Sequence, residues 1–205
     1  ALEKEGSVCT LDFYVFEQVC RDIRAWLDAG IEPVCTSVNF SKIHLHDENL
    51  AGEILGIMEK YQVDSKYIEV ELTELTGYEN YTELEKFVRA IKQSGIKTSI
   101  DDFGTGYSSL NMLKDINADI IKLDKTFLDH LLADDSRQDE IVIKNIVNMI
   151  NELDMEAIAE GVETHEQAEF LRTVNCKMAQ GFLYDRPLPH DEFEQRLVHQ
   201  QIYHV

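Results

Sequence analysis

Short apolar runs alternate with amphipathic stretches along the whole chain, and this alternation limits the possible folds more than any other feature of the sequence. The runs are rich in β-formers, whereas the stretches between them repeat apolar residues at helical spacing. Strands that alternate with helices are typical of βα units and a parallel sheet. We predict six strands, over residues 34–40, 67–72, 97–100, 118–123, 157–159 and 180–184.

Two architectures fit this pattern: a flavodoxin-like open sheet, and a (β/α)8 TIM-like barrel with six of its strands in the sequence. No glycine-rich GxGxxG or P-loop motif follows a predicted strand, which argues against dinucleotide-binding and P-loop folds. No Gly/Ser-rich linker divides the chain, so we expect residues 1–205 to form a single domain. The first predicted helix has an apolar face of Val15, Phe16, Val19, Ile23, Trp26 and Leu27.

The charge balance narrows the possible partners. The chain has 19 Lys and Arg against 39 Asp and Glu, a net charge of −20. Such a surface repels duplex nucleic acid, and an anionic substrate would need a cation between it and the protein. The apolar runs are too short to span a bilayer, and the first ten residues do not resemble a signal peptide. We therefore expect a cytoplasmic domain without membrane contact of its own, although other domains could tether a parent protein to a membrane.

The four cysteines show neither a CxxC pair nor metal-like clustering. We expect reduced, semi-buried thiols, as is usual in a cytosolic protein. These residues are Cys9, Cys20, Cys35 and Cys176.

Polar residues gather where the predicted strands end. Because the carboxyl ends of parallel strands open on one face of a barrel, these side chains should converge there. Gln180 fits this pattern less well, since it begins its predicted strand. The residues that close or follow the first five strands are Asn39, Glu71, Glu74, Asp101, Asp102, Lys122, Asp124, Glu160 and Glu163.

An acid after a strand can simply cap the next helix, and this interpretation suits Asp12, Asp124 and Glu163. It suits Asp101 and Asp102 less well, because adjacent acids repel each other unless a cation or a donor lies between them. Lys122 lies inside the apolar run IIKL, where a buried ammonium is costly without a carboxylate partner. We therefore expect a functional cluster at these strand ends.

The chemistry of the cluster indicates which ion it would bind. Carboxylate and amide oxygens select hard divalent cations such as Mg²⁺ or Mn²⁺, whereas zinc prefers His or Cys. His44 and His46 lie shortly after the first predicted strand, and we expect both to be polar surface residues. The sequence therefore predicts a magnesium or manganese site.

Six motifs of this chain resemble those of the EAL domain family, in the family's order and spacing. They are VNFS at 38–41, ELTE at 71–74, DDFGTGYSSL at 101–110, KLD at 122–124, AEGVET at 159–164 and QGFLYDRPLP at 180–189. The resemblance covers essentially the whole chain. It implies a bacterial phosphodiesterase that hydrolyses the second messenger cyclic di-GMP to linear 5′-pGpG, on a (β/α)8 barrel with two Mg²⁺ or Mn²⁺ ions.

The resemblance also implies a set of metal ligands. Asn39, Glu71 and Asp101 would bind the first ion, and Asp101 would bridge to the second. Asp102 and Glu160 would bind the second ion. Asp102 would also face the substrate, and Glu160 would also take part in catalysis.

The resemblance implies roles for three further residues. Lys122 would hold or help activate the attacking water, and Gln180 would lie beside that water and the phosphate. Glu74 would steady the loop at 104–109. The resemblance favours a homodimer as well.

The sequence departs from the family in one motif, the one that gives the family its name. No Glu-Ala-Leu strand, which carries a further metal ligand, occurs in the sequence, and residues 1–6 (ALEKEG) resemble the segment that follows that strand. We therefore expect residues 1–205 to be a single EAL-type domain that is N-terminally incomplete. The alternative function is a degenerate EAL domain that binds cyclic di-GMP or a partner protein without turnover.

Overall fold

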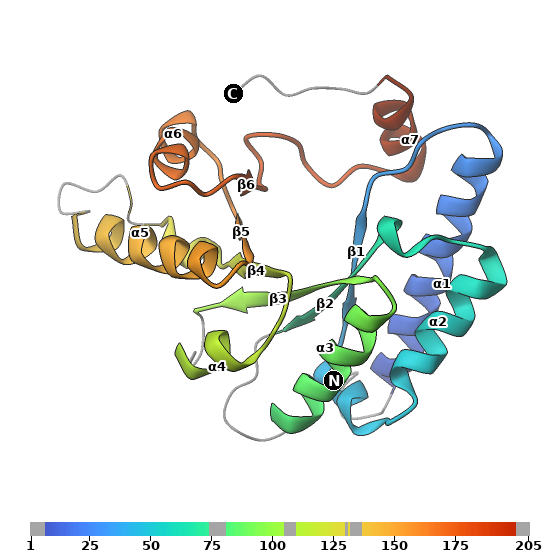
Figure 1. The fold of residues 1–205 in the computed structure, drawn as a ribbon. Helices are drawn as coiled ribbons and strands as arrows, with labels where there is room; N and C mark the ends of the chain where they lie inside the picture. Colours follow the sequence, from blue (N-terminus) through green and yellow to red (C-terminus); the bar gives the residue numbers. More distant parts are fainter. Residues whose placement is uncertain (1–6, 74–80, 105–109, 130, 132–136, 200–205) are drawn as a thin grey trace.

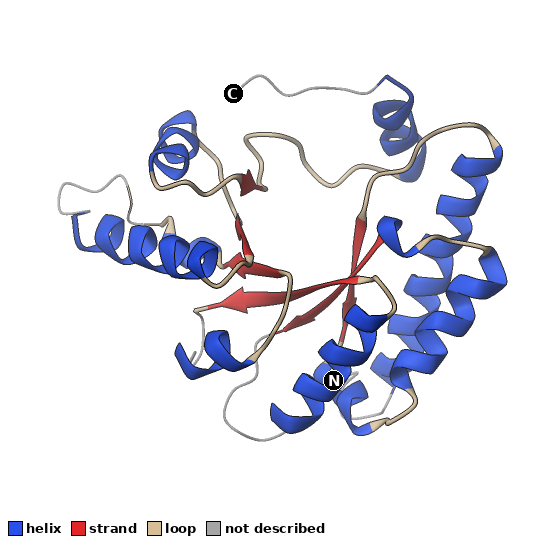
Figure 2. Ribbon diagram, in the orientation of Figure 1, coloured by secondary structure: helices blue, strands red, loops and turns tan. Residues whose placement is uncertain are grey.

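A computed structural model describes residues 7–73, 81–104, 110–129, 131 and 137–199. Its six strands form one sheet in which neighbours along the chain are neighbours in space, and every pair is parallel (Figure 2). The strands are β1 (Thr36–Phe40), β2 (Ile68–Thr73), β3 (Lys97–Phe103), β4 (Ile120–Leu123), β5 (Glu156–Ala159) and β6 (Met178–Ala179).

The helices lie outside the curved sheet and follow the strands in alternation (Figure 1). The α-helices are α1 (Ser7–Asp28), α2 (Leu50–Tyr61), α3 (Tyr81–Gln93), α4 (Leu110–Asp115), α5 (Arg137–Glu152), α6 (His165–Thr173) and α7 (His190–His199). Short 3-10 helices are η2 (Lys42–His46), η3 (Ser65–Tyr67) and η4 (Lys125–Phe127). Among the described residues, no helix is long and apolar enough to cross a bilayer.

The strand order decides between the two predicted architectures. A flavodoxin-like sheet reverses its strand order at a switch point, whereas the strands of a barrel follow one another in sequence. The observed order β1-β2-β3-β4-β5-β6 is sequential throughout. The TIM-like α/β fold is therefore confirmed, and the flavodoxin-like alternative is wrong.

The hydrophobic core lies between the sheet and the helices. Alternate residues of a strand point to opposite faces, so β2 directs Val70 and Leu72 toward the helices and Glu71 toward the inner face. On α1 the buried stripe contains Phe16, Cys20, Ile23 and Trp26, whereas Val15 is exposed, unlike the prediction. This packing fixes which side chains of each strand face the interior of the barrel.

The predicted sixth strand is misplaced. The strand is Met178–Ala179, and residues 180–184 form a loop after it, with a turn at 182–184. The run QGFLY reads as a strand because it is apolar and aromatic, but Phe182 is exposed and Gly181 takes a φ of 156°. Gln180 consequently follows its strand, as the other polar residues do.

Two of the three predicted caps are wrong. Asp124 caps η4 as predicted, since its side chain accepts a hydrogen bond from the Thr126 amide. Asp12 lies inside α1, and α6 is capped by Thr164 rather than by Glu163. The Thr164 hydroxyl accepts from the Gln167 amide and the Gln167 side chain accepts from the Thr164 amide, a capping box that leaves no such role for Glu163.

The prediction for His44 is also wrong. The His44 ring is buried, and its Nε2 lies 3.0 Å from the Asp12 carboxylate, which also accepts from the Ser41 amide. Asp12 therefore ties α1 to the segment after β1. All four cysteines are free thiols; two of them, Cys20 and Cys176, are buried and Cys35 is exposed.

Candidate active site

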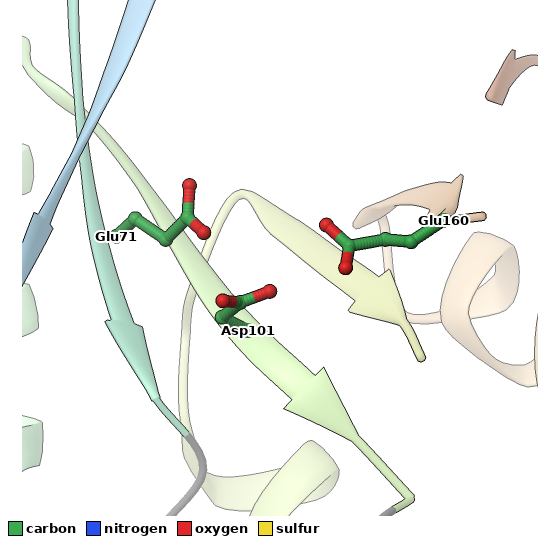
Figure 3. Close-up of side chains that lie close together, drawn as sticks. All are labelled: Glu71, Asp101 and Glu160. Atoms are coloured by element: carbon green, nitrogen blue, oxygen red, sulfur yellow. The ribbon is translucent and has the colours of Figure 1, made fainter. Parts of the chain in front are cut away.

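Three carboxylates from three different parts of the sheet converge on one small volume. Glu71 lies on β2, Asp101 on β3, and Glu160 directly follows β5. Each offers an oxygen within 4.8 Å of the others, and the three side chains point toward a common space (Figure 3). The predicted convergence of strand-end acids is therefore observed for these three residues.

Lys122 of β4 lies at the centre of this group. Its Nζ is 2.7 Å from Glu71 Oε1, 2.8 Å from Glu160 Oε1 and 3.6 Å from Asp101 Oδ1. The Lys122 side chain is only 7% exposed, so these carboxylates are the partners that a buried ammonium requires. We call these four residues the Lys122 cluster.

An irregularity in β3 brings two adjacent aspartates to the same strand end. Two residues of β3, Asp101 and Asp102, lie opposite the single residue Lys122 of β4, which is the geometry of a β-bulge. Asp102 adopts a φ of 54°, in the left-handed region that few residues other than glycine occupy. The paired positions on either side of the bulge are Ile100 with Ile121 and Phe103 with Leu123.

Negative charge exceeds positive charge in the Lys122 cluster. Burial opposes the charge on Lys122, but its hydrogen bonds to Glu160 and Glu71 outweigh burial and raise its pKa. Burial raises the pKa of Glu71, and Asp101 adds to this effect although Lys122 opposes it. The pKa of Glu160 is also raised, first by burial. One ammonium therefore does not compensate three carboxylates, and the site favours a further positive charge.

One oxygen of this cluster has no hydrogen-bond donor among the described residues. Asp101 Oδ1 is buried, and its distance of 3.6 Å to Lys122 Nζ exceeds that of a hydrogen bond. A buried carboxylate oxygen without a donor is costly. The oxygen-only donor set and this orphaned atom both fit a hard divalent cation.

Asn39 and Gln180 lie on opposite flanks of the cluster. Asn39 of β1 pairs in register with Glu71, and its side chain is exposed. Gln180 donates from Nε2 to Glu160 Oε1, and its backbone amide bonds to Ala159, so it is anchored beside Glu160. Glu74 lies outside the described residues.

Two further polar residues, which were not among the predicted site residues, line the same inner face one layer below. Glu69 precedes Glu71 by two residues, Ser99 precedes Asp101 by two, and both are buried. The Ser99 hydroxyl has no hydrogen-bond partner within the described part of the chain. The alternation of polar residues in YIEVEL and TSID would have revealed both positions.

Comparison with known families agrees with this geometry. The sequence model of the EAL domain family matches residues 1–187. The chain belongs to the EAL domain family. It spans about a quarter of the length of the curated relatives that it matches.

Relatives of this EAL domain include the cyclic di-GMP phosphodiesterase NbdA of Pseudomonas aeruginosa. The two are 35% identical over 187 residues, which are 91% of this chain and 24% of NbdA. Among solved structures, the cyclic di-GMP complex of the PaMucR phosphodiesterase has a TM-score of 0.83 and 32% identity, over 94% of this chain and 77% of that one. The calcium and cyclic di-GMP complex of Klebsiella pneumoniae BlrP1 has a TM-score of 0.77 and 25% identity, over 91% and 46%.

Proposed function

We propose that this EAL domain hydrolyses cyclic di-GMP to linear 5′-pGpG in bacterial second-messenger signalling, with two Mg²⁺ or Mn²⁺ ions. The observation that carries the proposal is the convergence of Glu71, Asp101 and Glu160 around Lys122. The names of NbdA and PaMucR support the substrate, and the calcium complex of BlrP1 supports a divalent cation.

The proposed ligands of the ions are carboxylate and amide oxygens, listed here by the strand from which each comes: Asn39 of β1, Glu71 of β2, Asp101 and Asp102 of β3, and Glu160 after β5. The excess of carboxylates over ammonium groups and the orphaned Asp101 oxygen support this assignment. When bound, the ions would lower the pKa of a water molecule and offset the negative charge of the phosphate.

Two side chains would act directly on the water and the phosphate. Lys122 remains an ammonium, so it can donate a hydrogen bond to the attacking water and hold it in place. Gln180 is exposed, and its amide is already oriented by Glu160, so it can donate to a phosphate oxygen that arrives from solvent. Glu74 keeps its proposed role of steadying residues 104–109.

Within the described residues β1 pairs only with β2, and Asn39 is exposed at that edge. We propose that a further strand lies against β1 and adds an acidic ligand next to Asn39, as the family resemblance implies. We also propose that the domain is a cytoplasmic homodimer. Sedimentation of the purified protein tests whether it is a dimer.

The decisive experiment is a hydrolysis assay of the purified protein with cyclic di-GMP and Mg²⁺ or Mn²⁺. We expect linear 5′-pGpG as the product, loss of turnover with EDTA, and recovery when the ion is added back. Turnover that survives EDTA would refute the metal-dependent mechanism. Tight binding of cyclic di-GMP without any pGpG would instead establish the alternative, a binding domain without turnover.

A further inference from the structure

Lys122 and a divalent cation would draw on the same three carboxylates. The three acids whose oxygens lie within 4.8 Å of one another are also the three that Lys122 approaches. Two of these contacts, to Glu71 at 2.7 Å and to Glu160 at 2.8 Å, are short charge-assisted hydrogen bonds. A cation that enters this group must share those carboxylates with Lys122 or displace it from them.

We propose that Lys122 is an internal competitor that sets the affinity of the site for its metal ions. This inference rests on the proposed function and adds a second role for Lys122, distinct from the contact with water. The ammonium holds the three carboxylates together and lowers the negative charge that a cation meets. The ions are therefore held less tightly than three carboxylates alone would hold them.

The burial of Lys122 makes this competition strong. Its side chain is 7% exposed and that of Glu71 is 3% exposed, so water screens neither charge effectively. The β-sheet also limits escape, because β4 pairs on both sides and its neighbours Ile121 and Leu123 are buried against the core. Lys122 therefore stays near the carboxylates whether or not it donates to them.

Neutral replacements of Lys122 test the proposal. Lys122→Met preserves the length of the side chain and removes the charge, and Lys122→Gln keeps a hydrogen-bond donor. Lys114→Met is the matched control, because Lys114 is 69% exposed and contacts only Asp115 among the acids of the described residues. The affinity for Mn²⁺ alone is measured by titration calorimetry, without substrate.

We expect both neutral Lys122 variants to bind Mn²⁺ at least tenfold more tightly than the wild type, whereas Lys114→Met should be unchanged. Equal or weaker binding by the folded Lys122 variants would overturn the proposal, since Lys122 would then only orient the carboxylates. If a variant unfolds without metal, the Mn²⁺ concentration that restores its circular dichroism gives the affinity instead.

The same data separate this inference from the proposed function. Absence of Mn²⁺ binding to the wild type would refute the proposed metal site itself. Mn²⁺ binding and pGpG formation by the wild type, without tighter binding by Lys122→Met, would leave the function intact and refute only the competition. We expect Lys122→Met to bind tightly and to hydrolyse poorly, which is the pattern of a residue that weakens metal binding while it serves the chemistry.

Discussion

Two charged clusters of this domain have opposite stoichiometry. In the Lys122 cluster one ammonium faces three carboxylates. In the second cluster, which we call the Glu17 cluster, a single oxygen of Glu17 on α1 faces three donors. These are Lys60 Nζ at 2.7 Å, Tyr61 OH at 2.7 Å and Arg21 at 3.3 Å.

The difference shows in the pKa values of the two glutamates. Hydrogen bonds from Lys60 and Tyr61 lower the pKa of Glu17 to about 2, whereas burial and Asp101 raise that of Glu71. Excess donors satisfy a carboxylate and tie α1 to α2. Excess carboxylates leave a demand for positive charge, which is useful only if a cation or substrate meets it. The ratio of donors to acceptors therefore distinguishes a structural cluster from a candidate functional one.

The largest expected effect is on catalysis. Asp101→Asn keeps the shape of the side chain but removes a charge from the Lys122 cluster. We expect pGpG formation to fall by more than about 100-fold, since loss of groups that merely orient metal ligands already costs about 10–100-fold. Glu17→Gln and the cap variant Asp124→Asn should change the rate by less than about threefold, because neither residue touches the Lys122 cluster. Similar losses of activity in all three variants would show that the Lys122 cluster is no more important for catalysis than the Glu17 cluster.

The second prediction concerns stability without metal. Glu71→Gln removes one of the repelling carboxylates while its amide oxygen still accepts from Lys122. We expect the melting temperature in EDTA to rise by about 2–4 °C, the shift that corresponds to roughly 1 kcal/mol in a domain of this size. Glu17→Gln should lower it. The melting temperatures are measured by scanning calorimetry. A lower value in both variants would show that the carboxylates of the Lys122 cluster do not repel one another enough to destabilise the domain.

Much of the site was predictable because it depends on strand periodicity. Five of the six strands and the acids that end them follow from the alternation of apolar runs with helical stripes. The partners of Lys122 were predictable as a class, because a buried ammonium demands carboxylates. Which carboxylates approach it required the structure.

The errors arose where tertiary contacts override local pattern. The prediction for β3 stopped at Ile100, because two adjacent aspartates do not suggest a strand and a bulge leaves no signature in composition. His44 was expected at the surface, because its partner Asp12 is 32 residues away in the sequence. The Glu17 cluster was missed for the same reason, since α1 and α2 supply its members separately.

The third prediction uses the lowered pKa of Glu17. A carboxyl group with a folded-state pKa below its unfolded value stabilises the protein above the unfolded pKa, and this stabilisation is lost as the pH falls. For Glu17 the loss should occur between about pH 4.5 and pH 2. The difference in unfolding free energy between wild type and Glu17→Gln, from urea melts, should therefore shrink across this window. If this difference in unfolding free energy does not change with pH, Lys60 and Tyr61 do not stabilise the ionised form of Glu17.

The smallest effect is expected from the lysine of the Glu17 cluster. Lys60 is 60% exposed, so solvent screens its ion pair with Glu17. In Lys60→Met, Tyr61 and Arg21 still donate to the same Glu17 oxygen. We expect the melting temperature to change by less than about 2 °C, as for other exposed ion pairs.

Lys122→Met offers the matched comparison, since it removes the only cation that approaches its three carboxylates within the described ranges. In EDTA at neutral pH this variant should lose far more stability than Lys60→Met, because its carboxylates are left buried and uncompensated. Saturating Mn²⁺ should restore most of that loss and should have no effect on Lys60→Met. Equal losses in the two lysine variants would show that neither burial nor the ratio of donors to acceptors sets the contribution of these charges to stability.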